Sequence, residues 1–240
     1  EMATRGEVFM MLYRLLNNTC ATDNYTHPTP QIEDYFCPGN HKSDNLAREV
    51  GVSEGNFHHY SETSFALDGV GLSLNFGHEY NSYLTDLPDD FFPVRPLGHG
   101  WTHTYNSYIL DVPVWDEDNQ EVEQKMILVF PSGQMQVWDN PQSSYPYSCV
   151  VETKGVYETL TVNGANTVTV KTKSQMTYSY EKMSVGTSHD VFLIRSITER
   201  NGHTITINYE TGVGTGSPKR ISNVVRDLGN SKTSERTLYF

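Results

Sequence analysis

Apolar and polar positions alternate with a period of two through much of the chain after residue 70. In Gly71–Tyr80 every second side chain is Leu, Phe, His or Tyr, a pattern typical of a strand with one buried face. The short apolar run 126–130 leads through a Pro-Ser-Gly turn into 134–138, which predicts a hairpin. Alternation returns in 176–180 and 205–209. We therefore expect this part of the chain to be all-β.

A further hairpin is predicted around Asn163-Gly164, which lies between the apolar segments 160–162 and 167–170. Asn and Gly both tolerate the positive φ angles that tight hairpin turns require. The sequence therefore places the turn at these two residues.

The first 18 residues carry a different pattern. Thr4 and Glu7 have the spacing of a capping box. Val8, Leu12, Leu15 and Leu16 then recur at helical intervals, so we expect an amphipathic helix that ends at Asn17-Asn18. Residues 19–52 are rich in proline and polar residues and show no periodicity, which is typical of a linker.

Composition narrows the class of protein. Only 37% of the residues are hydrophobic, but 12% are aromatic, and the formal net charge is −12. An acidic surface repels phosphate backbones and anionic membranes, which argues against nucleic acid as a partner. No apolar run approaches the roughly 20 residues of a membrane span. The chain begins at Glu1 and ends in the strand-like run 237–240, so we expect a piece of a longer protein.

Two stretches near the C-terminus match one another. Residues 194–202 align with 221–229, and each is followed by a second strand-like segment, 204–209 in the first copy and 237–240 in the second. One such unit cannot bury its apolar face alone. We therefore expect the two copies to stack in one continuous sheet.

These residues carry a family resemblance. The run from Ile197 to Tyr209 resembles an RHS/YD repeat, with Glu199 as its acidic residue and Tyr209-Glu210 in place of the Tyr-Asp pair. In the second copy Val225-Arg226-Asp227 departs from this pattern. Upstream, the segments 55–57, 72–82 and 96–105 resemble, in order and spacing, the head domain that precedes RHS repeats. Ala3–Leu16 is similar to the last helix of an S-layer homology repeat.

The resemblance implies a mainly β fold, a curved antiparallel sheet of hairpins preceded by a short helical segment and a linker. It divides the chain into the helix at 1–18, the linker at 19–52, an all-β head domain at 53–190 and truncated repeats at 191–240. It also implies a non-catalytic segment of a large secreted or cell-surface protein, part of a β-shell that encapsulates or displays a C-terminal effector or toxin domain. The alternative is a module that binds carbohydrates or cell surfaces, with cell-wall polysaccharide or surface glycans as partners.

The residues with reactive or metal-binding side chains do not form a recognisable site. His99 and His103 would share one face of a helix, but neighbouring Pro and Gly disfavour a helix, and in a strand they lie about 13 Å apart. One bridge between Cys20 and Cys37 and three unpaired thiols, including Cys149, are both compatible with the sequence. We predict no enzyme, no catalytic residue, no metal and no cofactor. The other groups that we considered and set aside are Cys20 with Cys37 and His41, His58-His59 with Glu62, the glycine-rich loop 212–216, and sugar stacking on Trp101, Trp115 and Trp138.

Overall fold

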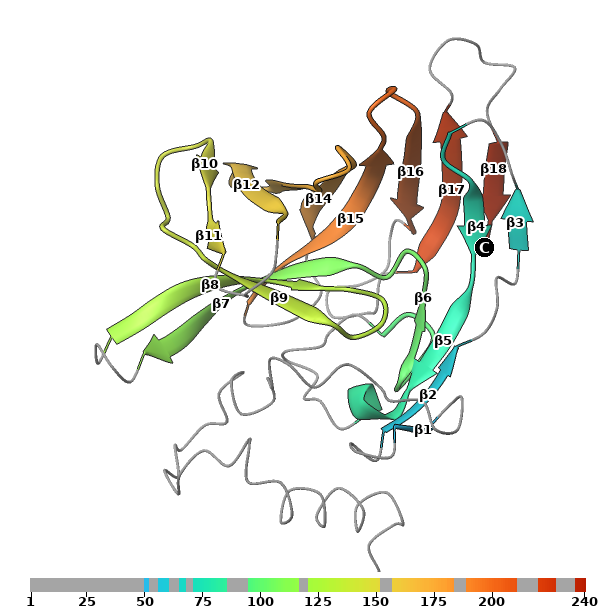
Figure 1. The fold of residues 1–240 in the computed structure, drawn as a ribbon, viewed down its shortest axis with the longest axis horizontal. Coiled ribbons are helices and arrows are strands. Elements are labelled where there is room, and N and C mark those ends of the chain that lie inside the picture. The colour runs from blue at the N-terminus through green and yellow to red at the C-terminus, as the bar shows by residue number, and fades with distance from the viewer. Residues whose placement is uncertain are drawn as a thin grey trace, which may run out of the picture.

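The computed structural model describes residues 50–51, 56–60, 65–67, 71–85, 95–116, 121–151, 157–183, 189–210, 220–227 and 236–240. The predicted helix at 1–18 and most of the linker lie outside these residues. Strands dominate the described part, and the one helical element is the 3-10 turn η2 (Ser82–Thr85). The mainly β class and the curved antiparallel sheet are thereby confirmed (Figure 1). No described helix is long and apolar enough to cross a membrane.

Most strands belong to one antiparallel sheet that closes on itself. Its neighbours run in the order β12, β13, β14, β15, β7, β8 and β9, and the segment 147–151 then bridges β9 back to β12. In this segment β10 pairs with β12 over two residues, and β11 pairs with β9 over two. The ring is therefore completed by very short pairings. Its strands are β7 (Tyr108–Asp116), β8 (Glu121–Val129), β9 (Met135–Asp139), β10 (Tyr147–Ser148), β11 (Val150–Val151), β12 (Thr159–Gly164), β13 (Thr167–Lys171), β14 (Thr177–Met183) and β15 (Asp190–Thr198).

The sheet branches at β15. The first part of this strand, Asp190–Leu193, pairs with β7, whereas Ser196–Thr198 pair with β16 (Thr204–Tyr209). From β16 the sheet continues through β17 (Ile221–Asp227) to β18 (Arg236–Tyr239). Figure 1 shows β15 to β18, coloured orange to red, as a row of upright strands above the green strands β7 and β8.

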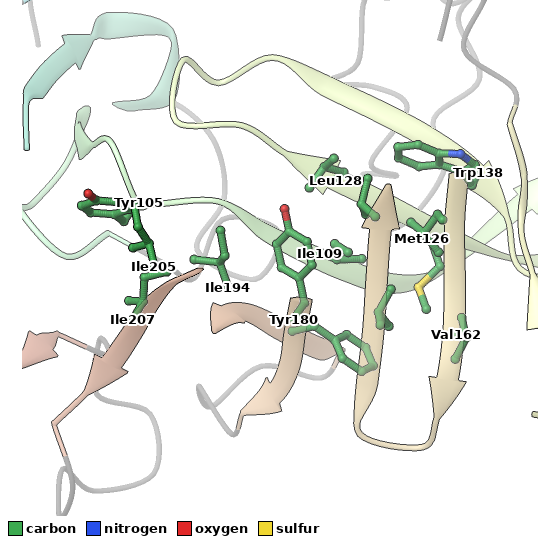
Figure 2. Packing of buried hydrophobic residues seen from close by; sticks show 14 of the residues in the cluster. Tyr105, Ile109, Met126, Leu128, Trp138, Val162, Tyr180, Ile194, Ile205 and Ile207 are labelled. Atoms are coloured by element: carbon green, nitrogen blue, oxygen red, sulfur yellow. The ribbon is translucent and has the colours of Figure 1, made fainter. Parts of the chain in front are cut away.

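The interior of the ring and the inner face of the strip share one apolar core (Figure 2). Alternation along the strands supplies it, because each strand contributes every second side chain. The largest side chain is Trp138, which is 0% exposed. Other members are Tyr105, Ile109, Met126, Leu128, Leu160, Val162, Val168, Val170, Tyr180, Phe192, Ile194, Ile205, Ile207 and Val224.

Strands β7, β8 and β9 are buried on both faces. Met126 and Leu128 point into the ring, while Ile127 and Val129 join a second cluster on the opposite side. A strand with two buried faces has no polar alternation, which explains the continuous apolar run that predicted the hairpin at 126–138. That hairpin is confirmed, with Phe130 N–H donating to Gln134 O at 2.9 Å.

The remaining strands form two small units. A four-stranded sheet has the order β1 (Val50–Gly51), β2 (Asn56–Tyr60), β5 (His78–Asn81) and β6 (Trp101–His103). Strands β3 (Phe65–Leu67) and β4 (Leu74–Phe76) form a separate hairpin. The expectation of one strand over Gly71–Tyr80 is thus wrong, because β4 and β5 join different sheets.

Gly77 causes this interruption. Its N–H donates to the Thr104 hydroxyl at 2.9 Å, and its carbonyl accepts the Thr104 N–H at 3.1 Å. The backbone is satisfied by a residue from another segment and leaves the ladder at this point. Alternation alone does not reveal such a partner.

The predicted position of the 160–170 turn is also wrong by two residues. The hairpin exists, but Gly164 still pairs with Thr167, so Ala165 and Asn166 form the turn. The register shifts between Val162 and Gly164, which is a β-bulge at Asn163. Gly164 does not have a positive φ, so the feature that favoured an Asn-Gly turn is not used here.

Candidate functional site: the repeat strands and their open edge

The two repeat copies fold alike. Each forms a strand and an antiparallel return strand, and all four strands are neighbours in one sheet. Residues that align between the copies also face equivalent partners, so the copies share a register. The matching cross-strand pairs are Ile197 with Ile205 and Thr198 with Thr204 in the first copy, and Val224 with Leu238 and Val225 with Thr237 in the second.

The acidic residue of the first copy has a structural role. The Glu199 N–H donates to His203 O at 3.0 Å, and Gly202, with φ +87°, donates its N–H to Glu199 O at 2.9 Å. The Glu199 carboxylate also contacts the His203 ring nitrogen. Gly71 lies directly over this pair, where a Cβ atom would overlap both side chains. Glu199 therefore stabilises the turn, and glycine at position 71 allows the neighbouring segment to pack on it.

Arg226 fastens the β3–β4 hairpin to the repeat strands. Its side chain is buried, and one guanidinium nitrogen donates to Leu67 O at 3.1 Å and Leu72 O at 3.4 Å. Phe76 of β4 packs on Phe240 with ring centroids 4.6 Å apart. The hairpin thus covers the apolar face of the last strands, held by polar contacts as well as by packing.

One edge of β18 is open. Among the described residues β18 pairs only with β17, and Tyr239 at this edge is 75% exposed. Phe240 donates its N–H inward to Ser222 O at 3.1 Å. Backbone groups alternate in direction along an antiparallel strand, so the amides of Thr237 and Tyr239 point outward. An outward row of amides and carbonyls is a template for another strand.

A polar cluster holds the short pairings that close the ring. The Asn140 amide donates to the Asp111 carboxylate at 3.1 Å, and its carbonyl oxygen accepts the Tyr147 hydroxyl at 2.8 Å and the Gln142 N–H at 3.2 Å. Burial raises the pKa of Asp111. These contacts connect β7, the end of β9 and β10, which are the three elements that meet at the closure.

An acidic residue and a thiol lie beside this cluster. Asp190 is the cross-strand partner of Asp111 and accepts a hydrogen bond from Lys182 at 2.5 Å. Burial, and then the negative charges of Asp111 and Asp139, raise the pKa of the Cys149 thiol to about 12. A thiol with so high a pKa is a poor nucleophile at neutral pH. The cluster is organised to hold strands together.

The structure keeps the candidate histidines apart. His103 is buried and its ring Nδ1 accepts the Tyr105 N–H at 3.2 Å, whereas His99 is exposed and contacts Arg95. Burial lowers the pKa of His103 to about 4. His59 lies on β2, opposite Tyr80. Across the described ranges no three His, Cys, Asp or Glu side chains form a group that could hold a metal.

The aromatic candidates differ from one another. Trp138 is enclosed in the core, so a sugar cannot reach it, which agrees with the prediction that most of the aromatic side chains serve packing. Trp101 is 37% exposed. The side chain of Trp115, the groups around Cys20, Cys37, His41, His58 and Glu62, and the loop 212–216 lie outside the described residues.

Sequence reasoning missed Arg226 and Asn140. Arg226 lies two residues after Val224 on the inward face of β17, and a charged residue at an inward position is a signal for a buried partner. Asn140 follows β9 and precedes Pro141, a context in which an Asx turn is favoured. Neither signal identifies the partner.

Fold and site together define a mainly β protein in which, among the described residues, a ring of strands leads into a strip of repeated strand pairs. Residues 47–123, about a third of the chain, match the family model described as "Domain of unknown function (DUF6531)". No curated protein matches. The matched residues contain the three segments that resemble the RHS head domain, 55–57, 72–82 and 96–105.

Several solved structures are distantly similar. The N-terminal domain of effector protein SpvB from Salmonella typhimurium strain LT2 is 13% identical with a TM-score of 0.39, over 74% of this chain and 71% of that one. TcdB2-TccC3 without its hypervariable C-terminal region gives 14% and 0.41, over 70% and 10%. The Photorhabdus luminescens Tc holotoxin pore gives 14% and 0.42, over 72% and 9%. The chain thus spans about a tenth of the two toxin chains, and likenesses this distant assign no function.

Proposed function

We propose that this chain is a non-catalytic structural segment of an RHS-type β-shell. The closed ring forms a packed end, and β15 to β18 begin a strip of RHS/YD-type repeats onto which further hairpins pair. The completed shell encloses or displays an effector or toxin domain of the same parent protein, outside the cell or at its surface. The segment 1–18, for which the sequence predicts a helix, would then belong to an S-layer homology-like anchor.

The observation that carries this proposal is the shared register of the two repeat copies together with the outward amides of β18. Stacked hairpins satisfy their backbone groups through the neighbouring hairpin, so a strip of this kind extends by adding equivalent units to its edge. The family match over 47–123 and the resemblance of the same region to an RHS head domain agree with this assignment.

The open edge provides the test. Tyr239→Pro removes an outward N–H, and proline is tolerated at such a position of an edge strand. Leu238→Pro removes an inward N–H and breaks the pairing with β17. Tyr239→Ala removes the exposed ring but keeps the amide, and it is the matched control for the loss of the side chain.

We expect the wild-type chain and Tyr239→Ala to self-associate as concentration rises, and Tyr239→Pro to stay monomeric with an unchanged circular dichroism spectrum. Analytical ultracentrifugation measures the first property. Leu238→Pro should instead lower stability. A wild-type chain that remains monomeric at all concentrations, or association that is the same in Tyr239→Pro, would remove the support for an extending strip.

A further inference from the structure

The β3–β4 hairpin has one apolar face, and the core covers only part of it. Phe65 and Phe76 are cross-strand partners, as are Leu67 and Leu74. Opposed side chains and every second side chain lie on the same side of a sheet, so these residues share one face. Leu74 is buried in the main core, and Leu67 and Phe76 pack against it. Phe65 lies outside this core and is 37% exposed, so the apolar face extends past the core at this residue.

The exposed end of this face lies at the open edge of the strip. Phe76 packs on Phe240, and Phe240 is itself 51% exposed. Leu238, two residues earlier, packs against the core, so the side chain of Phe240 points to the same side of the strip. In the view of Figure 1, β3 lies beyond β18, on the side away from β17. The hairpin that covers the last strands therefore reaches past their edge.

The backbone beside these rings is open. The amides of Thr237 and Tyr239 point away from β17, and within the described ranges β18 has no second neighbour. The exposed rings of Phe65 and Phe240 thus adjoin a row of outward amides and carbonyls. Peptides that add to a sheet edge use these two elements together, because main-chain hydrogen bonds give affinity and contacts with alternate side chains give specificity.

The existing strands of the strip indicate which side chains fit under the hairpin. Ile207, Val224 and Leu238 are successive cross-strand partners on β16, β17 and β18, and all belong to the core or pack against it. A strand paired with β18 adds the next member of this row opposite Leu238. Two residues along, its side chain lies opposite Phe240. Large apolar side chains at these positions bury the exposed rings, whereas polar side chains lose this gain.

We propose that the edge of β18 and the rings of Phe65 and Phe240 form one docking site for an antiparallel β-strand with large apolar side chains at alternate positions. The backbone of β18 binds the strand, and the two rings cover its inward side chains. The direction follows the strip, in which every pairing is antiparallel. This inference rests on the proposed function, since the occupant is a further strand of the strip. It adds that the β3–β4 hairpin selects this strand.

The test supplies a strand as a separate peptide to the full chain. The probe is a fluorescein-labelled copy of residues 203–210, in which Ile205 and Ile207 alternate with polar residues. A second peptide has threonine at both isoleucine positions. Fluorescence anisotropy, below the concentration at which the chain self-associates, measures both affinities. We expect the wild-type chain to bind the isoleucine peptide about tenfold more tightly than the threonine peptide, and Tyr239→Pro to bind neither.

Phe65→Ser should reduce this preference to about twofold or less, because the isoleucines lose the ring that covers them. Phe65→Leu should keep most of it. Tyr157→Ser is the matched control and should leave the preference unchanged, because Tyr157 is 73% exposed beside Lys173, between β13 and β14. If Phe65→Ser does not fold, nuclear Overhauser contacts between the isoleucine methyl groups and the Phe65 ring of the wild-type chain decide the question.

The inference is overturned if neither peptide binds, if Tyr239→Pro binds them as the wild type does, or if the preference for isoleucine is the same in Phe65→Ser as in the wild type. Its failure can be told apart from failure of the shell assignment. A chain that self-associates through β18, but whose peptide preference does not depend on Phe65, retains the proposed function and loses the role of the hairpin.

Discussion

Asn140 should be the residue on which ring closure depends most strongly. It is 7% exposed, and its one side chain serves Asp111, Tyr147 and Gln142. Asn140→Leu keeps the approximate volume of the side chain but removes all three hydrogen bonds. The pairings of β10 and β11 are only two residues each, so apart from the Cys149 N–H bond to Leu160 O and the packing of Tyr147 and Cys149, the segment 147–151 depends on these contacts.

The expected loss of stability follows from the number and charge of the hydrogen-bond partners of Asn140. A hydrogen bond between neutral groups contributes about 1 kcal/mol net, and one to a charged group about 1.5–3 kcal/mol. Burial of the apolar leucine side chain restores part of this free energy. We therefore expect Asn140→Leu to lower the free energy of unfolding by about 3 kcal/mol. Tyr147→Phe removes only the hydroxyl and should cost about 1 kcal/mol.

Urea denaturation followed by circular dichroism measures both variants, and hydrogen exchange at residues 147–151 locates the effect. Asn163→Leu is the matched control, because Asn163 is exposed and its amide bonds only to surface partners; it should change stability by no more than about 0.5 kcal/mol. The reasoning is refuted if Asn140→Leu costs no more than this control, or if exchange at 147–151 is unaffected.

Two other substitutions test buried polar groups. Burial lowers the pKa of His103 from 6.5 to about 4. Because the pKa in the folded state is lower than in the unfolded state, the free energy of unfolding is unaffected by this histidine above about pH 6.5. It falls by about 3 kcal/mol as the pH drops toward 4. His103→Gln should show less of this loss in urea denaturation at stepped pH, and an identical pH profile would contradict it. Arg226→Met should cost about 2 kcal/mol, since two carbonyl bonds are lost, and should speed hydrogen exchange in β3; unchanged exchange there would show that packing alone holds the hairpin.

Local pattern was enough to predict the hairpins whose partners lie close in sequence. The β8–β9 hairpin and the β15–β16 repeat unit follow from alternation plus a glycine-containing turn. The stacking of the two repeat copies followed from their internal match, because a unit with an unburied apolar face requires a neighbour. In these cases the interacting segments are close in sequence, so the local pattern is sufficient to predict them.

The features that it did not predict depend on distant partners. Gly77 leaves the ladder because of Thr104, 27 residues away, and Arg226 reaches a carbonyl 159 residues earlier in the chain. The closure of the ring depends on pairs too short to leave a periodic signal. Trp138 and Trp101 look alike in sequence, but Trp138 lies on β9 in the core of the main sheet, whereas Trp101 lies on β6 of the small sheet and is 37% exposed.

The branch at β15 explains how one sheet can be both closed and open. A strand has two edges, and β14 occupies one edge of β15 from Val191 to Thr198, with a register shift at Arg195. The other edge is divided between β7 and β16, which would leave backbone groups unpaired where the two diverge. Ser107, at the start of β7, resolves this. Its carbonyl accepts the Ile194 N–H at 3.3 Å, and its hydroxyl contacts Val129 O and the Tyr180 hydroxyl at 3.1 and 3.0 Å.

Beyond that point the last residues of β15 pair with β16, and Arg195 reaches Ile207 O at 3.3 Å. The ring can therefore pack around its core while the strip departs from it, with the Ile194 N–H satisfied by Ser107 at the junction. A closed barrel alone has no edge to extend, and an isolated strip has no closed end. Dividing one edge of a single strand gives this chain both, which is the arrangement that the start of an extending shell requires.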